Sequence, residues 1–128
     1  MENYGFIRVA ACSPRVKVAD IDYNTSEILS AIDTAEEKKV SLLVFPELCV
    51  TGYTCGDLFA QDLLISEAEK AVVKIKTYTR AKEVTVVVGV PVRHLDRLYN
   101  CAAVIRNGMV RGLVPKIYVP NYGEFYES

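Results

Sequence analysis

Two largely apolar runs constrain the fold of this chain more than any other feature: residues 40–45 (VSLLVF) and residues 84–92 (VTVVVGVPV). Both have the length of a strand, and neither shows the strict alternation of a strand with one face in water. Such runs are typical of strands that lie inside an α/β sheet and are covered on both sides. The sequence therefore predicts a layered α/β domain.

Helical periodicity lies between these runs and before them. A first helix is expected to begin at Asn24, because Glu27 follows it three residues later in the manner of a capping box. A second helix is expected to begin at Ser66, with Glu69 in the matching position. The residues expected to face the core are Ile28, Leu29, Ile32 and Ala35 in the first helix and Ala68, Val72, Ile75 and Thr79 in the second.

The remaining strands are predicted at the start and the end of the chain. Residues 6–12 (FIRVAAC) are expected to form the first strand, and residues 98–105 and 109–114 the last two. Asn107 and Gly108 separate the last two runs, and this dipeptide tolerates the positive φ angles of a type I′ hairpin turn. The predicted order is β-α-β-α-β followed by a hairpin, in a sheet that is parallel at first and antiparallel later.

Composition indicates one globular domain over residues 1–128, because 51% of the residues are hydrophobic and 24% are charged. A net charge of −1 gives no electrostatic footprint for nucleic acid or for an anionic membrane. No apolar stretch approaches the length that spans a bilayer, and the first residues lack the pattern of a signal peptide. We therefore expect a cytoplasmic protein without nucleic-acid or membrane partners.

The cysteines point away from a metal site. Cys12, Cys49, Cys55 and Cys101 include no CxxC pair, and His94 is the only histidine, expected in an exposed turn. Cys12 and Cys101 fall in predicted strands and are expected in the core. Cys49 and Cys55 lie in the loop after residues 40–45, where partial exposure is expected. No metal is predicted for the chain.

Two charged residues stand at the ends of apolar runs. Glu47 follows the run at 40–45, and carboxyl ends of strands are where working residues collect in open α/β sheets. A partly desolvated carboxylate there is a candidate general base, with a surface carboxylate or a helix cap as the alternatives. Lys116 stands at the end of another apolar run and lies between Pro115 and Pro120, which restrict the backbone around it. The alternative is an exposed surface lysine.

These two segments together resemble a known family. The stretches FPELCVTGY (residues 45–53) and PKIYVPNYGEFYE (residues 115–127) resemble the carbon–nitrogen hydrolase (nitrilase) superfamily. Over longer stretches, the chain is more similar to the glutaminase domains of glutamine-dependent NAD synthetases than to other branches. The resemblance runs over nearly the whole chain. It implies an αββα sandwich, of which residues 1–128 would form the first half.

The resemblance implies a Glu-Lys-Cys triad that hydrolyses carbon–nitrogen bonds. Glu47 would be its general base, and Lys116 would stabilise the negative charge on the carbonyl oxygen. The nucleophilic cysteine of the family follows the lysine at a later strand-to-helix turn, and no cysteine follows Lys116 here. Neither Cys49 nor Cys55 matches that position, so the chain alone is expected to be inactive.

The resemblance also implies a substrate pocket. Residues that match positions near the pocket are Tyr53, Tyr122, Phe125 and Glu127. For each of them, a structural or exposed role is the alternative. Glu124 competes with Glu127 for the acidic position beside Lys116, and Asp57 is expected to cap a short helix.

The expected substrate is glutamine, and the expected partner is the C-terminal remainder of the enzyme, in a homo-oligomer. ATP and Mg are implied only for a synthetase domain, which is absent here because no glycine-rich phosphate loop occurs. No cofactor is expected in this chain itself. Two other interpretations stay open: a fragment of a stand-alone amidase or nitrilase, and a non-catalytic assembly module.

Overall fold

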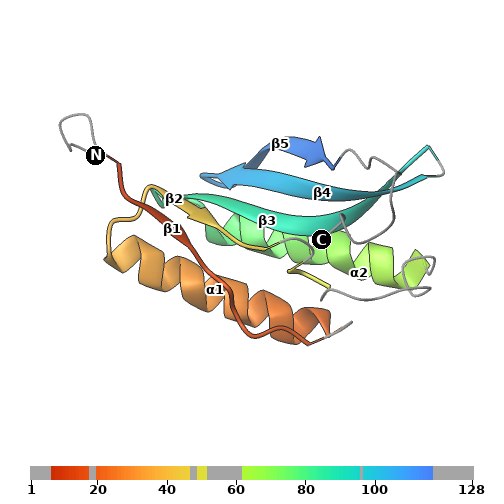
Figure 1. Ribbon diagram of the computed structural model, residues 1–128, viewed down its shortest axis with the longest axis horizontal. Helices are drawn as coiled ribbons and strands as arrows, with labels where there is room; N and C mark the ends of the chain where they lie inside the picture. Colours follow the sequence, from red (N-terminus) through yellow and green to blue (C-terminus); the bar gives the residue numbers. More distant parts are fainter. Residues whose placement is uncertain (1–6, 18–19, 47–48, 52–61, 96, 117–128) are drawn as a thin grey trace, which may run out of the picture.

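The predicted order of strands and helices is confirmed by the computed structural model, which describes residues 7–17, 20–46, 49–51, 62–95 and 97–116 (Figure 1). Along the chain the elements are β1 (Val9–Ala11), α1 (Ile21–Glu37), β2 (Leu42–Val44), α2 (Asp62–Tyr78), β3 (Thr85–His94), β4 (Arg97–Arg106) and β5 (Met109–Pro115).

One five-stranded sheet holds the strands in the order β1-β2-β3-β4-β5. The pairs β1–β2 and β2–β3 are parallel, whereas β4 runs antiparallel to β3 and β5 runs antiparallel to β4. The turn between β4 and β5 has φ angles of 46° at Asn107 and 80° at Gly108, as a type I′ turn requires. The change from parallel to antiparallel pairing is therefore confirmed.

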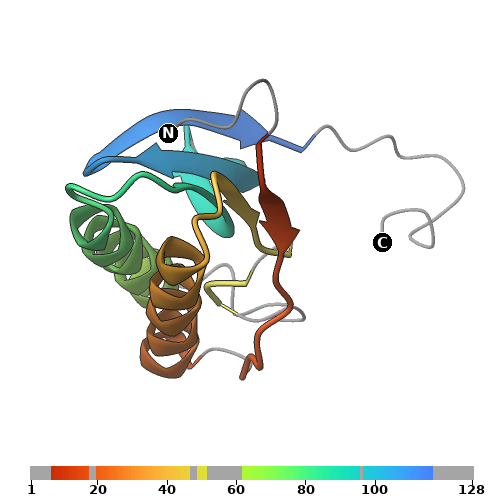
Figure 2. The same ribbon diagram turned by 90° about the vertical axis from the view of Figure 1, so that its left-hand side faces the viewer.

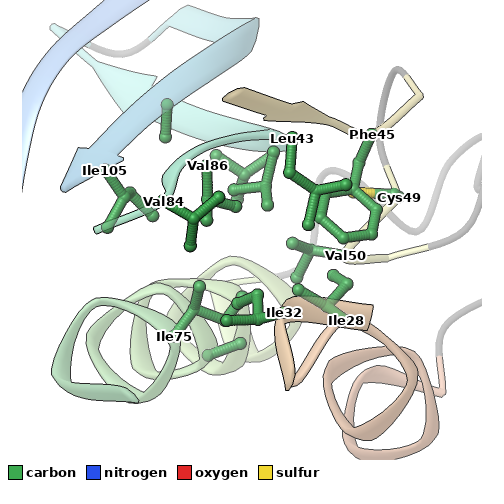
Figure 3. Close-up of a cluster of buried hydrophobic side chains, with 14 of the residues drawn as sticks. Ile28, Ile32, Leu43, Phe45, Cys49, Val50, Ile75, Val84, Val86 and Ile105 are labelled. Atoms are coloured by element: carbon green, nitrogen blue, oxygen red, sulfur yellow. The ribbon is translucent and has the colours of Figure 1, made fainter. Parts of the chain in front are cut away.

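Both helices lie on one face of the sheet, as the end-on view shows (Figure 2). The hydrophobic core fills the space between the two helices and the sheet. Many of its wholly buried members come from the two helices and from β3 and β4, among them Ile28, Ile32, Ile75, Val86 and Ile105 (Figure 3). The predicted core faces of the helices are confirmed, although Leu29 and Val72 at their margins are only half-buried.

The other face of the sheet has no helix over it among the described residues. Strand pairing assigns Val9, Val44, Val87, Val104 and Val114 to this face, which we call the outer face. Val9 is 57% exposed and Val114 is 58% exposed. The prediction that residues 40–45 are covered on both sides is wrong for this chain, because Val44 is 37% exposed.

Both helices begin earlier than the sequence pattern predicts. Asp20 caps α1 by accepting a hydrogen bond from the backbone N–H of Tyr23 (3.1 Å), so Asn24 is an internal residue of the helix. Helix α2 begins at Asp62 instead of Ser66, and its early residue Ile65 is buried. Within the described residues, the helices fall short of the length and apolarity that crossing a membrane requires.

We expect Ile32→Ala to lower the free energy of unfolding by about 2–5 kcal/mol, because it leaves a cavity in the core. The matched control is Val73→Ala on α2, where the side chain is 53% exposed and the cost is expected to stay below about 0.5 kcal/mol. Urea unfolding of the 128-residue chain measures both values. Equal costs for the two variants would contradict the helix-to-sheet core.

Candidate functional site

Glu47 lies outside the described residues, but the backbone on both sides of it is anchored to the same strand. Before it, the N–H of Phe45 donates to the carbonyl oxygen of Val87 in β3 (2.9 Å). After it, the N–H of Val50 donates to the carbonyl oxygen of Gly89 (3.3 Å). The loop therefore leaves the carboxyl end of β2 and returns to the side of β3 within a few residues.

The segment that follows Glu47 is part of the core. Cys49 is 2% exposed, and both Val50 and Thr51 are completely buried. In Figure 3, Cys49 and Val50 lie beside Phe45, near Ile28 of α1. This burial holds the end of the loop against the scaffold, and function-bearing loops depend on such rigid support.

Asn24 is a buried polar residue next to this loop, and the sequence analysis missed its role. Its side chain is completely buried, and its Nδ2 donates to the carbonyl oxygens of Lys17 (2.8 Å) and Val50 (3.0 Å). Its Oδ1 accepts from the backbone N–H of Lys17 (2.7 Å). The capping-box pattern suggested a helix start here, and a polar residue in line with Ile28 and Ile32 was the signal for a buried role.

Lys116 follows the end of β5 directly. Its backbone N–H donates to the carbonyl oxygen of Asn100 in β4 (2.8 Å), and its side chain is exposed. Because β5 runs parallel to β2 and β3, its end lies at the same edge of the sheet as the end of β2. Strands β2 and β5 are three strand spacings apart across the sheet, which is about 14 Å. The topology thus brings the segments of Glu47 and Lys116 to one edge.

The described cysteines are free thiols held in the protonated form. Burial raises the pKa of Cys49 to about 11, and the Cys49 thiol lies 3.9 Å from the carbonyl oxygen of Gly89. Burial also raises the pKa of Cys12 and of Cys101. The expectation that Cys49 is partly exposed is wrong, because its side chain belongs to the hydrophobic core and is 2% exposed.

The other predicted site residues are not located by the described structure. Those outside the described residues are Tyr53, Cys55, Asp57, Tyr122, Glu124, Phe125 and Glu127. His94 is exposed at the end of β3, as predicted. Among the residues that the structure describes, no group of three or more His, Cys, Asp or Glu side chains could hold a metal ion.

Comparison with known proteins gives consistent relatives. The chain is 40% identical over 125 residues to the glutamine-dependent NAD(+) synthetase of Mycobacterium tuberculosis, an alignment that covers 98% of this chain and 18% of the relative. The crystal structure of a glutamine-dependent NAD(+) synthetase from Cytophaga hutchinsonii superposes with a TM-score of 0.85 at 35% identity, over 94% of this chain and 20% of that chain. The chain thus spans about a fifth of these relatives.

A third neighbour shows how widely the fold is shared. The crystal structure of an amidase from Nesterenkonia sp. superposes with a TM-score of 0.78 over 92% of this chain and 44% of that chain, at 23% identity. The five-stranded sheet with two helices is therefore a partial nitrilase-type α/β fold. The family model for carbon–nitrogen hydrolases matches residues 8–128, nearly the entire sequence, and the chain therefore belongs to this family of enzymes.

Proposed function

We propose that this chain supplies the glutamate and the lysine of a glutaminase domain, whose complete form releases ammonia from glutamine. The observation that carries the proposal is the 40% identity, over 98% of this chain, to a protein named glutamine-dependent NAD(+) synthetase. The sheet topology supports it, because the loop that contains Glu47 and the residue Lys116 both leave the same edge.

In the first half of the reaction, the Glu47 carboxylate accepts the proton of a cysteine thiol that lies beyond Ser128. The sulfur then attacks the side-chain amide carbon of glutamine. The Lys116 ammonium stabilises the negative charge that forms on the carbonyl oxygen. When the carbon–nitrogen bond breaks, protonated Glu47 returns its proton to the leaving nitrogen, and ammonia departs from a thioester.

In the second half, water hydrolyses the thioester. Glu47, now a carboxylate again, takes a proton from the water as its oxygen attacks the thioester carbon. The carbon–sulfur bond breaks, the sulfur recovers a proton from Glu47, and glutamate leaves. Tyr53, Tyr122, Phe125 and Glu127 are proposed to line the pocket that holds the glutamine.

The ammonia would pass to a synthetase domain in the C-terminal remainder of the enzyme, for amidation of nicotinic acid adenine dinucleotide. ATP and Mg belong to that domain. No cofactor is proposed for residues 1–128, whose sequence contains no glycine-rich phosphate loop. We also propose a cytoplasmic location, in which the free thiols of Cys12, Cys49 and Cys101 would stay reduced.

We expect Glu47→Gln and Lys116→Met each to lower the rate of glutamine hydrolysis by about 100-fold or more, because each removes a group that acts in the transition state. The assay uses a chimaera in which this chain replaces the matching 125 residues of the Mycobacterium tuberculosis relative, with ammonia release as the readout. The matched controls are Glu67→Gln and Lys70→Met, which alter a surface ion pair on α2 (3.3 Å).

The control variants are expected to keep the activity of the chimaera, since an exposed ion pair contributes little to stability. A folded chimaera that hydrolyses small aliphatic amides but not glutamine would favour the amidase interpretation. A folded chimaera with no hydrolase activity would favour the non-catalytic module.

Cys49 is a poor candidate for the nucleophile. The reactive form of a cysteine is the thiolate, and with a pKa of about 11 only about one Cys49 thiol in a thousand is ionised at pH 8. The thiol is also buried, so neither a substrate nor a base reaches it from solvent. In line with the family resemblance, the proposal places the nucleophile outside residues 1–128.

We expect Cys49 in the folded 128-residue chain to resist alkylation by iodoacetamide between pH 7 and pH 9, and to react after unfolding in guanidinium chloride. Mass spectrometry of the labelled peptides measures this, with Cys49→Ala to assign the signal. The chain alone is expected to show no glutaminase activity. Turnover that disappears in Cys49→Ala or in Cys55→Ala would contradict this expectation.

The outer face supports a further part of the proposal. The chain covers 44% of the Nesterenkonia amidase at a TM-score of 0.78, so more than half of the length of that protein lies beyond the matched region. We propose that the rest of the hydrolase domain packs on the outer face, as a second sheet packs on a first in a sandwich. Homo-oligomers of the complete enzyme are a separate part of the proposal.

The 128-residue chain alone is expected to self-associate, because its outer face leaves apolar side chains in water. The variant Val9→Lys with Val114→Lys is expected to weaken this association, since Val9 and Val114 are 57% and 58% exposed on that face. Light scattering over a range of concentrations measures the molar mass. A monomer at high concentration, for the unmodified chain, would count against the proposal.

A further inference from the structure

We infer that Asn24 is a positioning residue that anchors the loop carrying Glu47 to helix α1. This inference rests on the proposed function for the role of Glu47, while the anchoring itself is a property of the described structure. The carbonyl group of Val50, which Asn24 holds, lies three residues beyond Glu47 in the chain.

The side chain of Asn24 makes three hydrogen bonds to two loops, using both hydrogens of Nδ2 and one acceptor position of Oδ1. Its Nδ2 donates one hydrogen bond to Lys17 (2.8 Å) and one to Val50 (3.0 Å), both at carbonyl oxygens. Its Oδ1 accepts from the N–H of Lys17 (2.7 Å). Lys17 follows β1 and Val50 follows β2, so one buried carboxamide joins the loops that leave two neighbouring parallel strands.

The peptide groups of Val50 are held from two directions. Its N–H donates to Gly89 of β3, and its carbonyl oxygen accepts from Asn24 of α1. Helix α1 is itself fixed in the core by Ile28 and Ile32, which are completely buried. The segment after Glu47 is therefore tied both to the sheet and to a rigid helix, which limits the positions open to the loop.

No other side chain of similar size makes this set of hydrogen bonds. Aspartate has no donor for the two carbonyl oxygens and would place a buried negative charge against them. Leucine matches the volume but leaves the polar groups of Lys17 and Val50 without their partner. Each buried group that loses its partner disfavours the observed loop conformation.

A purely structural role for Asn24 requires a matched control, which Thr79 provides. Thr79 is also completely buried, and its Oγ1 donates to the carbonyl oxygen of Lys76 (2.7 Å) and accepts from the N–H of Gly108 (2.9 Å). It lies at the opposite edge of the sheet, next to the β4–β5 turn. Thr79→Val therefore removes buried hydrogen bonds without touching the loop of Glu47.

The first experiment measures amide hydrogen exchange by NMR in the 128-residue chain with Asn24→Leu or Thr79→Val. The Val50 amide is the probe, and the Thr85 amide, bonded to Ser41 (2.8 Å), is the reference. In Asn24→Leu, exchange at Val50 is expected to rise at least about tenfold more than exchange at Thr85. An equal rise at both amides would overturn the anchoring. If Asn24→Leu does not fold, Asn24→Ser is measured against the same expectation.

The second experiment places the same variants in the chimaera described above. Asn24→Leu is expected to lower kcat/KM for glutamine by about 10- to 100-fold, as small displacements of a catalytic group do. In Asn24→Leu, the fall of kcat/KM at acidic pH is expected to occur at a different pH, because the surroundings of Glu47 change. In Thr79→Val, this fall is expected at the same pH as in the unmodified chimaera.

The two experiments separate the two ideas. The positioning role would be overturned if the unmodified chimaera is active, Asn24→Leu and Thr79→Val lower kcat/KM equally, and neither variant shifts the pH profile. An unmodified chimaera without glutaminase activity would overturn the proposed function, while the exchange of the Val50 amide would still decide whether Asn24 anchors the loop.

Discussion

The packing of α1 and α2 against one face of the sheet is the contact on which the rest of the structure depends. The completely buried side chains of Ile28, Ile32 and Ile75 meet the equally buried valines of β3. Removal of this apolar surface from water is the dominant favourable term in folding a domain of this size. It fixes the helices, and through them the loops that leave the carboxyl ends of the strands.

Among the described residues, this core covers only one face of the sheet. The helices shield the inner face, whereas Val9, Val44 and Val114 of the outer face meet water. Apolar strand residues on both faces are typical of a sheet that lies inside a larger structure. The size of the amidase and synthetase relatives agrees with this, since the matched region is under half of the former and about a fifth of the latter.

The candidate site follows from the directions of the strands. Strands β2 and β3 are parallel, so both end at the same edge of the sheet. Strand β4 runs in the opposite direction and β5 reverses again, so β5 also ends at that edge. A base and a cation that are far apart along the chain can therefore serve one pocket, as the proposed reaction needs. The inferred role of Asn24 adds a second requirement, because the proposed reaction would also need the loop of Glu47 to keep its place against helix α1.

Local patterns in the sequence were enough to predict several elements. The spacing of Ile28, Ile32 and Ala35 predicted the buried face of α1, and Asn107-Gly108 predicted the hairpin. In these cases the determining interactions lie within a few residues of the chain. The positions of Glu47 and Lys116 at strand ends, and the family resemblance, indicated a site that still stands as a prediction.

Other features were decided only in three dimensions. The sequence pattern predicted a helix start at Asn24, but the structure caps the helix with Asp20, and the buried side chain of Asn24 bonds to Val50, 26 residues away. Cys49 looked like a loop thiol, yet it is buried in the hydrophobic core. By itself, the sequence determined which segments form strands and helices, because that depends on local periodicity and turn chemistry. Only the tertiary structure decided which polar groups are buried, because their partners come from distant parts of the chain.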